Sequence, residues 1–239
     1  MKTAIMSDFH SENPLEEVER LTRSGIEKFI FLGDYDNPQI LRDLLNLNVK
    51  HKKILTGNHD YDFAQGRQIY SPLLLSGIDY PRLWAQFPEE KQQILSSSKE
   101  NPENKVHSKV IDTISGKKIV YVHGSLDDGE YPYDSFHSNL HGRVFSDWGG
   151  PSLTFEKMIK EDFWILFKGH DHHSRTYSIP LEEKAFSPEL RLERGNVKFD
   201  KNRRYIVCVG CFNSVKGKYS IFDEDKLSLE VRKRKYSGY

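Results

Sequence analysis

The feature that most constrains the fold is a regular alternation of short apolar runs with amphipathic segments over residues 2–56. The apolar runs at 2–7, 28–32 and 53–56 have strand character, and each of them stops at a polar residue. Between them, apolar residues recur at helical spacing in segments 15–21 and 40–45. Strands that alternate with helices at this spacing are typical of crossover connections in a parallel sheet. The chain is therefore predicted to be an α/β protein.

The second half of the chain is richer in predicted strands than in helices. Further strands are expected at 109–114, 118–122, 163–168, 175–179, 205–209, 218–222 and 227–231. One helix is expected around 89–95, followed by an exposed polar loop at 96–105. A length of 239 residues is ordinary for one α/β domain. Residues 1–239 are therefore predicted to form a single domain, with 61–105 and 124–150 as insertions or loops at the rim of the site.

Composition excludes several classes of protein. Lys and Arg together number 35, as do Asp and Glu, so the net charge is zero and bulk attraction to nucleic acid is not favoured. The basic run at 232–235 is interpreted as a solvated tail. Disordered chains are poor in aromatic residues, whereas this one has 14 Phe and 12 Tyr. Its apolar runs are far shorter than the ~20 residues that span a bilayer. A cytoplasmic location without membrane contact is therefore expected.

Residues able to bind a metal directly follow five of the predicted strands. Taken in chain order, these residues are Asp8 with His10, Asp34, Asn58, His123, and His170 with His172. Ligands of open parallel sheets bind outside the carboxyl ends of the strands, so these side chains are expected to converge. Mixed Asp, Asn and His donors suit borderline cations such as Mn²⁺, Fe²⁺ or Zn²⁺.

The size of this donor set points to two metals. Seven donors are more than one tetrahedral centre uses, and they suit two cations that share a carboxylate. Two divalent cations beside Asp8 and Asp34 leave a residual positive charge, which attracts phosphate. Paired metals ~3.5–4 Å apart also lower the pKa of a shared water and stabilise in-line displacement at phosphorus. The donors therefore predict phosphoester chemistry.

The motifs that carry these donors appear in a characteristic order. They read Asp8-Phe9-His10, Gly33-Asp34, Gly57-Asn58-His59-Asp60, Val122-His123-Gly124 and Gly169-His170-Asp171-His172. In this order, over residues 8–172, the set resembles the calcineurin-like metallophosphoesterase superfamily, and in particular its compact prokaryotic-type phosphoesterases. The resemblance implies a four-layer α-β-β-α sandwich with two mixed sheets around a dinuclear metal centre.

The resemblance also implies a role for each donor. Those of the first metal would be Asp8, His10 and His172, those of the second Asn58, His123 and His170, and the bridging ligand Asp34. His59 would not bind a metal but would donate a proton to the leaving oxygen or contact the phosphate, which suits an imidazole because it titrates near neutral pH. Manganese is the expected metal, with iron, zinc, nickel and magnesium as alternatives.

Two positions depart from the pattern of the protein phosphatases in this superfamily. Those enzymes follow the bridging Asp with a second Asp three positions later and then Arg, whereas this chain has Asn37 there and no Arg after it. Either Asp36 or Asn37 is therefore expected to orient the catalytic His59. The next motif ends in Asp60 where the phosphatases carry Glu. Both departures argue against a phosphoprotein phosphatase and favour a small-molecule or diester hydrolase.

Other residues are weaker candidates. In segment 124–150, Arg143 is the candidate phosphate contact, and Tyr131 and Trp148 are candidates to stack on a nucleotide base. Cys208 and Cys211 have a spacing seen in zinc sites, but no second pair completes such a site. They are interpreted as a core residue and a residue near the end of a strand.

The sequence as a whole predicts a metal-dependent enzyme that hydrolyses a phosphodiester or phosphomonoester, a nucleotide among the candidates. The predicted mechanism is attack on phosphorus by a hydroxide that bridges the metals. Two other functions stay open: a nuclease acting on polynucleotides, which needs a basic groove, and a non-catalytic scaffold on the same fold, which could dispense with His59. A structural zinc site is disfavoured because the donors are rich in oxygen and lack thiolates. The expected partner is a small phosphorylated molecule.

Overall fold

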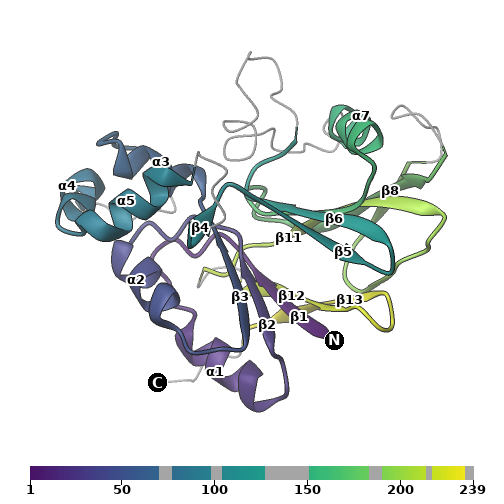
Figure 1. Ribbon diagram of the computed structural model, residues 1–239, viewed down its shortest axis with the longest axis horizontal. Helices are drawn as coiled ribbons and strands as arrows, with labels where there is room; N and C mark the ends of the chain where they lie inside the picture. Colours follow the sequence, from purple (N-terminus) through teal and green to yellow (C-terminus); the bar gives the residue numbers. More distant parts are fainter. Residues whose placement is uncertain (70–76, 98–103, 127–150, 183–189, 214–216, 235–239) are drawn as a thin grey trace.

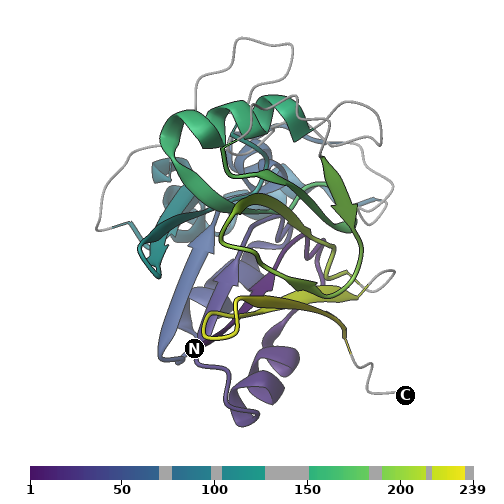
Figure 2. The same cartoon turned by 90° about the vertical axis from the view of Figure 1, so that its right-hand side faces the viewer.

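Two mixed sheets lie face to face, with helices on both outer sides (Figure 1). The structure is a computed structural model that describes residues 1–69, 77–97, 104–126, 151–182, 190–213 and 217–234. On the outside of one sheet lie helices α1 (Leu15–Arg23) and α2 (Pro38–Asn46), and on the outside of the other lies α7 (Pro151–Glu161) (Figure 2). The predicted α/β class and the four-layer sandwich of two mixed sheets are confirmed.

The first sheet contains the strands of the predicted crossover units. Its order is β10-β13-β12-β1-β2-β3-β4. The bounds of its strands are β1 (Lys2–Met6), β2 (Lys28–Phe31), β3 (His51–Leu55), β4 (Val106–His107), β10 (Val197–Lys198), β12 (Lys218–Asp223) and β13 (Ser228–Lys233). Strands β1 to β4 run parallel, whereas β12 pairs antiparallel with both β1 and β13. The carboxyl ends of β1, β2 and β3 therefore share one edge.

The second sheet is also mixed, with a parallel centre. Its order is β5-β6-β7-β11-β8-β9. The bounds of its strands are β5 (Lys109–Ile114), β6 (Lys117–Val122), β7 (Phe163–Lys168), β8 (Ser174–Pro180), β9 (Arg191–Glu193) and β11 (Arg203–Val209). Strands β6, β7 and β11 run parallel to one another. Strand β5 pairs antiparallel with β6, β8 pairs antiparallel with β11, and β9 pairs antiparallel with β8.

Within the described residues, three apolar clusters fill the spaces between the four layers. Side chains of a strand alternate between its two faces. In β1, Ala4 and Met6 accordingly pack with the helices, while Ile5 packs between the sheets. On the far side of the second sheet, Phe155 and Met158 of α7 complete the third cluster. The central strands are therefore buried on both faces, which fixes the positions of their ends.

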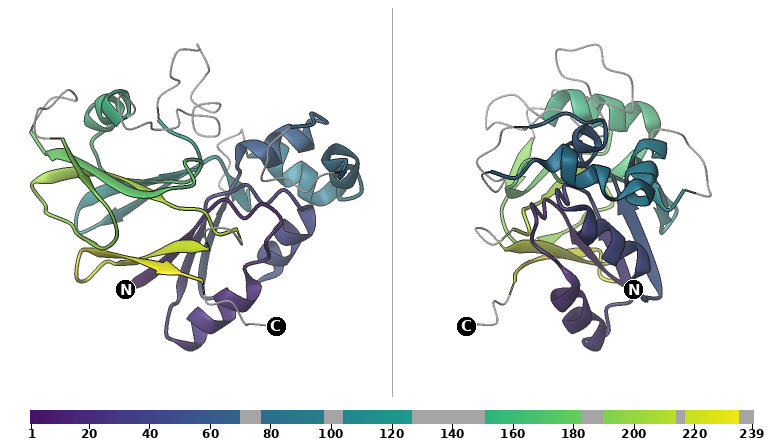
Figure 3. Two further views of the ribbon diagram at one scale, coloured as in Figure 1. Left: turned by 180° about the vertical axis from the view of Figure 1, so that it is seen from behind. Right: turned by 90° about the vertical axis from the view of Figure 1, so that its left-hand side faces the viewer.

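Three short helices stand beside the carboxyl edge of the first sheet (Figure 3). They are α3 (Asn58–Ala64), α4 (Tyr80–Ala85) and α5 (Pro88–Ser96). Helix α5 corresponds to the predicted helix, whereas α3, α4, α7 and the short strands β4, β9 and β10 were not predicted. The prediction of an exposed loop at 96–105 is wrong for its first two residues, because Ser96 belongs to α5 and Ser97 is buried, with its Oγ 2.8 Å from Oγ1 of Thr56. None of the described helices is both long and apolar enough to cross a membrane.

The basic residues near the carboxyl terminus are not a purely solvated tail. Arg232 pairs with Glu230 at 2.8 Å within β13. Arg234 pairs with Glu12 and lies over the ring of Phe212, 5.3 Å from its centroid. The interpretation of a solvated tail is therefore wrong for Arg234, which is 14% exposed and packed on the protein, whereas the pair of Arg232 with Glu230 is exposed to solvent.

Candidate metal centre

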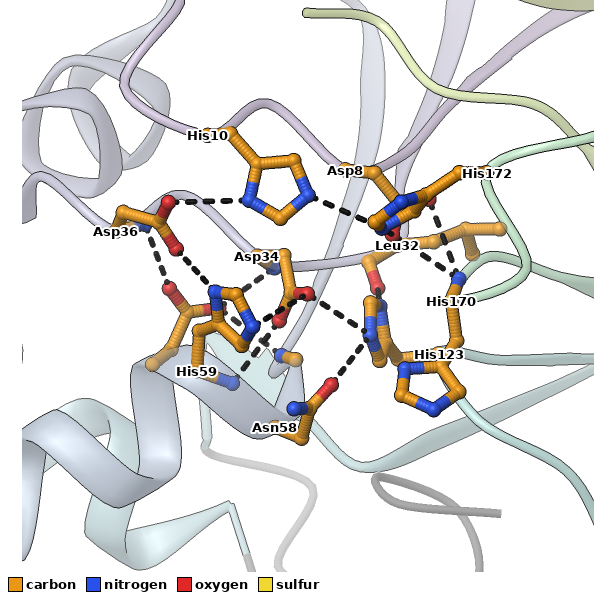
Figure 4. Close-up of polar contacts among 12 residues, drawn as sticks. Asp8, His10, Leu32, Asp34, Asp36, Asn58, His59, His123, His170 and His172 are labelled. Atoms are coloured by element: carbon orange, nitrogen blue, oxygen red, sulfur yellow. Dashed lines mark hydrogen bonds and ion pairs between the residues drawn. The ribbon is translucent and has the colours of Figure 1, made fainter. Parts of the chain in front are cut away.

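The predicted donors lie together at one edge of the two sheets. Strands β1, β2 and β3 contribute from the first sheet, and β6 and β7 contribute from the second. Figure 4 shows their side chains turned toward one another. The structure brings together all seven predicted metal-binding residues, which are Asp8, His10, Asp34, Asn58, His123, His170 and His172.

One group of donors is built around His10 and His172. The Nε2 atoms of the two rings approach to 3.1 Å, and Nε2 of His172 lies 3.2 Å from Oδ1 of Asp8. Ligand atoms of these three residues and of Asp34 all lie within 4.8 Å of one another. Donor atoms gathered this closely could hold one cation.

A second group is built around His123. Its Nε2 atom lies 3.0 Å from Oδ1 of Asn58 and 3.3 Å from Oδ2 of Asp34. Ligand atoms of Asp34, His123 and His170 lie within 4.8 Å of one another. Asp34 belongs to both groups, so its carboxylate stands between them.

Sharp turns after the strands place these donors. Positive φ angles between 43° and 64° occur at five of them: Asp8, His10, Asp34, His170 and His172. Residues other than glycine rarely adopt such angles, because each one costs about 1–3 kcal/mol of conformational energy. They persist only where the surrounding structure holds them in place. Hydrogen bonds between loops do so here, since Asp8 N donates to Gly33 O at 3.1 Å and His10 N donates to Asp34 O at 2.9 Å.

Gly57 lets two of these loops approach closely. A Cβ atom on Gly57 would lie 2.2 Å from both the backbone nitrogen and Oδ1 of Asp34. Its φ is −94°, an ordinary value, so the need for glycine comes from space and not from the turn. The absent side chain allows the end of β3 to touch the candidate bridging carboxylate.

The hydrogen bonds of the imidazoles fit a bound cation. Nδ1 of His10 lies 3.0 Å from the Asp36 carboxylate, and Nδ1 of His123 lies 2.8 Å from Leu32 O. Because these oxygens only accept, each Nδ1 carries a proton, and Nε2 is the atom that each ring turns to the centre. The Nε2 atoms converge there with carboxylate oxygens, an arrangement that suits a bound cation.

Neighbouring charges shift the pKa values of the donors. Burial raises the pKa of Asp8, but the hydrogen bond and charge of His172 together with the charge of His123 outweigh it, and the pKa falls to about 2. Burial lowers the pKa of His123, but the charge and hydrogen bond of Asp34 together with the charges of Asp8 and Asp60 outweigh it, and the pKa rises to about 9. Burial, reinforced by His123, holds the pKa of His170 well below its usual value, which keeps that ring neutral and able to bind a metal.

His59 lies beside both groups and is anchored by Asp36. Its Nδ1 is 2.9 Å from Oδ1 of Asp36, and its Nε2 is 4.0 Å from Oδ2 of Asp34. Burial lowers the pKa of His59, but the two carboxylates outweigh it and raise the pKa to about 10. Of the two candidate partners, Asp36 makes the contact. The side chain of Asn37 instead accepts from Gln39 N at 3.0 Å and caps α2.

Asp60 holds the site together, and the sequence analysis assigned it no role. Its carboxylate accepts hydrogen bonds of 2.8 to 3.2 Å from the backbone nitrogens of Asp34, Tyr35, Asp36 and Gly57. Burial, followed by the charge of Asp34, raises the pKa of Asp60 to about 7. The sequence feature that could have indicated this role is the position of Asp60 directly after Asn58 and His59 in one motif.

The remaining candidates fall in two places. Arg143, Tyr131 and Trp148 lie outside the described residues. Cys208 and Cys211 are both 1% exposed, and neither is in a disulfide. Cys208 lies in β11, in the core as predicted, and Cys211 lies two residues beyond the end of that strand.

The fold matches solved metallophosphoesterase structures. A metallophosphoesterase from Sphaerobacter thermophilus superposes with a TM-score of 0.62 at 20% identity, covering 99% of this chain and 89% of that one. The hypothetical protein PH1004 from Pyrococcus horikoshii OT3 gives a TM-score of 0.61 at 16% identity, covering 99% and 88%. These likenesses define a metallophosphoesterase-like fold.

The sequence identifies the family. Residues 1–186 match the calcineurin-like phosphoesterase superfamily domain, so the chain belongs to the calcineurin-like phosphoesterase superfamily. The predicted resemblance is confirmed, and the protein is a metal-dependent phosphoric ester hydrolase. No curated protein matches the chain.

Proposed function

We propose that the chain is a dinuclear enzyme that hydrolyses a small phosphodiester or phosphomonoester. The observation that carries the proposal is that two groups of donors share Asp34, and that within each group the ligand atoms lie within 4.8 Å of one another. In the proposed assignment the first cation is held by Asp8, His10 and His172, the second by Asn58, His123 and His170, and both by Asp34.

Bound divalent cations would supply Lewis acidity for the phosphoryl oxygens and a water acidic enough to attack phosphorus near neutral pH. The nitrogen and oxygen donors favour manganese in our proposal, with iron, zinc, nickel and magnesium as alternatives. The protein contributes by fixing the donors before substrate arrives, so that little reorganisation accompanies the reaction.

His59 is proposed to donate a proton to the leaving oxygen. Asp36 engages Nδ1, so Nε2 is the nitrogen left to face a substrate. The side chain is 10% exposed, which leaves a narrow edge of the ring accessible. Positive charge from bound cations lowers the pKa of an adjacent imidazole, and would bring that of His59 from about 10 toward neutrality.

A nucleotide is one proposed substrate. It rests on Tyr131 and Trp148 as stacking residues and on Arg143 as a phosphate contact, all from the sequence alone. Replacing Trp148 by Ala is expected to reduce the preference for nucleotides over simple aryl phosphates. Unchanged discrimination would contradict a stacking role.

The deciding experiment is a substrate panel with a matched pair of histidine variants. The panel contains an aryl phosphate monoester, its bis-aryl diester, several nucleotides and single-stranded DNA, each assayed with Mn²⁺, Mg²⁺ and Zn²⁺. His59→Ala is expected to lower kcat roughly 10²–10⁴-fold, the size of a general-acid effect. His51→Ala, at the exposed start of β3, is the control and is expected to keep wild-type kcat.

Three results would contradict the proposal. Fewer than two bound metals per chain would exclude a dinuclear centre. Full activity of His59→Ala would exclude its proton transfer. The absence of turnover on every substrate with every metal would favour the non-catalytic scaffold, and salt-sensitive cleavage of the DNA alone would favour the nuclease.

A further inference from the structure

A cysteine follows a sixth strand at the same edge of the sheets. Strand β11 runs parallel to β7, so its carboxyl end reaches the edge where His170 and His172 follow β7. The chain turns at Gly210, whose φ is +93°, and Cys211 comes next. Its side chain is buried, at 1% exposure, although it lies outside any strand.

Backbone hydrogen bonds hold this turn against the donors of the first group. Phe212 N donates to Ser7 O at 2.9 Å, which joins the turn to the end of β1. The Cys211 thiol donates to Asp8 O at 3.2 Å, the carbonyl of a proposed metal ligand. Lys218 N donates to Cys211 O at 2.9 Å, which ties the turn to β12. The thiol is therefore fixed beside the loop that carries Asp8 and His10.

The sulfur lies within reach of the same cation as two imidazoles. Sγ of Cys211 and ring nitrogens of His10 and His172 all lie within 4.8 Å of one another. These are the rings whose Nε2 atoms face each other at 3.1 Å. The first donor group thus has a soft ligand at its border, whereas the second group, on Asp34, His123 and His170, has none among the described residues.

Cys208 shows what an ordinary buried thiol of this chain looks like. It lies in β11, and its thiol donates to Oδ2 of Asp171 at 3.0 Å. The other oxygen of Asp171 pairs with the buried Lys168 at 2.6 Å. No donor group that could hold a metal includes Cys208 within the part of the chain described. The two cysteines therefore form a matched pair in which one lies beside the imidazoles.

We propose that Cys211 is a thiolate ligand of the first cation and makes that position selective for thiophilic metals. The inference rests on the proposed dinuclear centre and adds a donor to it. On binding, the sulfur–metal bond forms, the hydrogen bond to Asp8 O is lost, and the thiol proton passes to solvent. Thiolate favours zinc, cobalt or cadmium over manganese or magnesium, so the two positions would prefer different metals.

Cobalt substitution tests the inference without relying on activity. Metal-free protein is titrated with Co²⁺ and its absorption followed in the visible range, which reports any bound Co²⁺, and in the near ultraviolet, where thiolate-to-cobalt charge transfer absorbs. We expect both signals in the wild type. Cys211→Ser and Cys211→Ala are expected to keep the visible bands and lose the charge-transfer band, and Cys208→Ser to keep both.

The possible outcomes distinguish failure of the thiolate ligand from failure of the dinuclear centre. Visible cobalt bands without a charge-transfer band in the wild type, or a charge-transfer band that persists in Cys211→Ser, would overturn the thiolate ligand while leaving the dinuclear centre in place. Absence of all cobalt bands would overturn the centre and the ligand together. As a second readout, Cys211→Ser is expected to lower the ratio of Zn²⁺ affinity to Mn²⁺ affinity by about tenfold or more. Loss of a residue that only hydrogen-bonds to a metal ligand already lowers metal affinity by about this factor. An unchanged preference would count against the inference.

Discussion

One carboxylate, that of Asp36, engages two imidazoles with different tasks. Oδ2 lies 3.0 Å from Nδ1 of His10, a proposed metal ligand, and Oδ1 lies 2.9 Å from Nδ1 of His59, the proposed proton donor. Both rings are thereby held in one tautomer. The backbone of Asp36 is itself fixed, because Trp84 donates its indole N–H to Asp36 O at 2.7 Å.

Asp36→Asn is expected to lower kcat by roughly 10²-fold or more and to weaken binding of the first metal. An amide keeps the shape but replaces one acceptor oxygen by a donor, so it cannot accept from both rings. Steady-state kinetics and metal titration measure the two effects. The control is Asn37→Ala, which removes only a helix cap and is expected to cost about 1 kcal/mol of stability with kcat kept. A larger loss of kcat in Asn37→Ala than in Asp36→Asn would reverse this assignment.

The candidate metal-binding residues could be chosen from the sequence, and their convergence foreseen, because each follows an apolar strand within four residues. The sequence could not choose between Asp36 and Asn37, since the choice depends on the path of the turn before α2. Nor could it place Cys211 beside His10 and His172, because residues so far apart in the sequence meet only through the pairing of β11 with β7 and the packing of the two sheets.

Helices α2 and α5 are joined by one ion pair with good geometry. Arg42 donates Nε and Nη2 to the two oxygens of Glu90 at 2.8 and 3.0 Å. The Glu90 side chain is 4% exposed, and the Arg42 guanidinium also lies over the ring of Phe87, 4.5 Å from its centroid. This contact fixes α5 against the helix that follows the Asp36 turn.

Glu90→Gln is expected to lower the melting temperature at neutral pH by the equivalent of about 1 kcal/mol. The hydrogen bond from Arg42 lowers the pKa of Glu90 in the folded state below its usual 4.5. A depressed carboxyl pKa stabilises the fold above the unfolded value and loses that effect as pH falls through the folded value. The difference between variant and wild type should therefore shrink below pH 4.5. Thermal unfolding across pH measures it, with the exposed Glu89→Gln as control, and a difference independent of pH would exclude the ion pair.

At the scale of elements, the strands were easier to predict than the helices. Each longer strand coincides with an apolar run, and buried parallel strands are apolar on both faces. Helix α7 was missed although Pro151 suits a first helical position and Phe155, Met158 and Ile159 recur at helical spacing. Helix α3 is not evident from the sequence because its first turn carries the polar residues Asn58 and His59.

Across the whole molecule, the donors span the boundary between the two sheets. Four carboxylates, those of Asp8, Asp34, Asp36 and Asp60, are all 1% exposed or less and lie close together. Asp8 and Asp34 follow strands of the first sheet, whereas His123 and His170 follow strands of the second, so a cation held by both sets would attract groups of both sheets. Metal should therefore stabilise the contact between the sheets as well as serve catalysis.

Removal of metal with a chelator is expected to lower the melting temperature of the wild type. A cation at one hundred times its dissociation constant contributes about 2.7 kcal/mol per site. Asp34→Asn removes the carboxylate that both donor groups share, so its melting temperature should respond less to the chelator than that of the wild type. Calorimetry with and without chelator measures both. An unchanged melting temperature of the wild type would show that these carboxylates do not depend on a cation.

The pairing of β1 has a consequence for biosynthesis. The first strand of the chain lies between β2 and β12, and Lys2 stands opposite Asp223. A nascent polypeptide leaving the ribosome can form the β1-β2-β3 layer early, but the free side of β1 in that layer stays unpaired until β12 has been translated. Loops between partners so distant in sequence close slowly. The β12-β13 hairpin is thus the piece whose late arrival covers this margin of the sheet, and the growing chain must stay soluble with that margin uncovered until then.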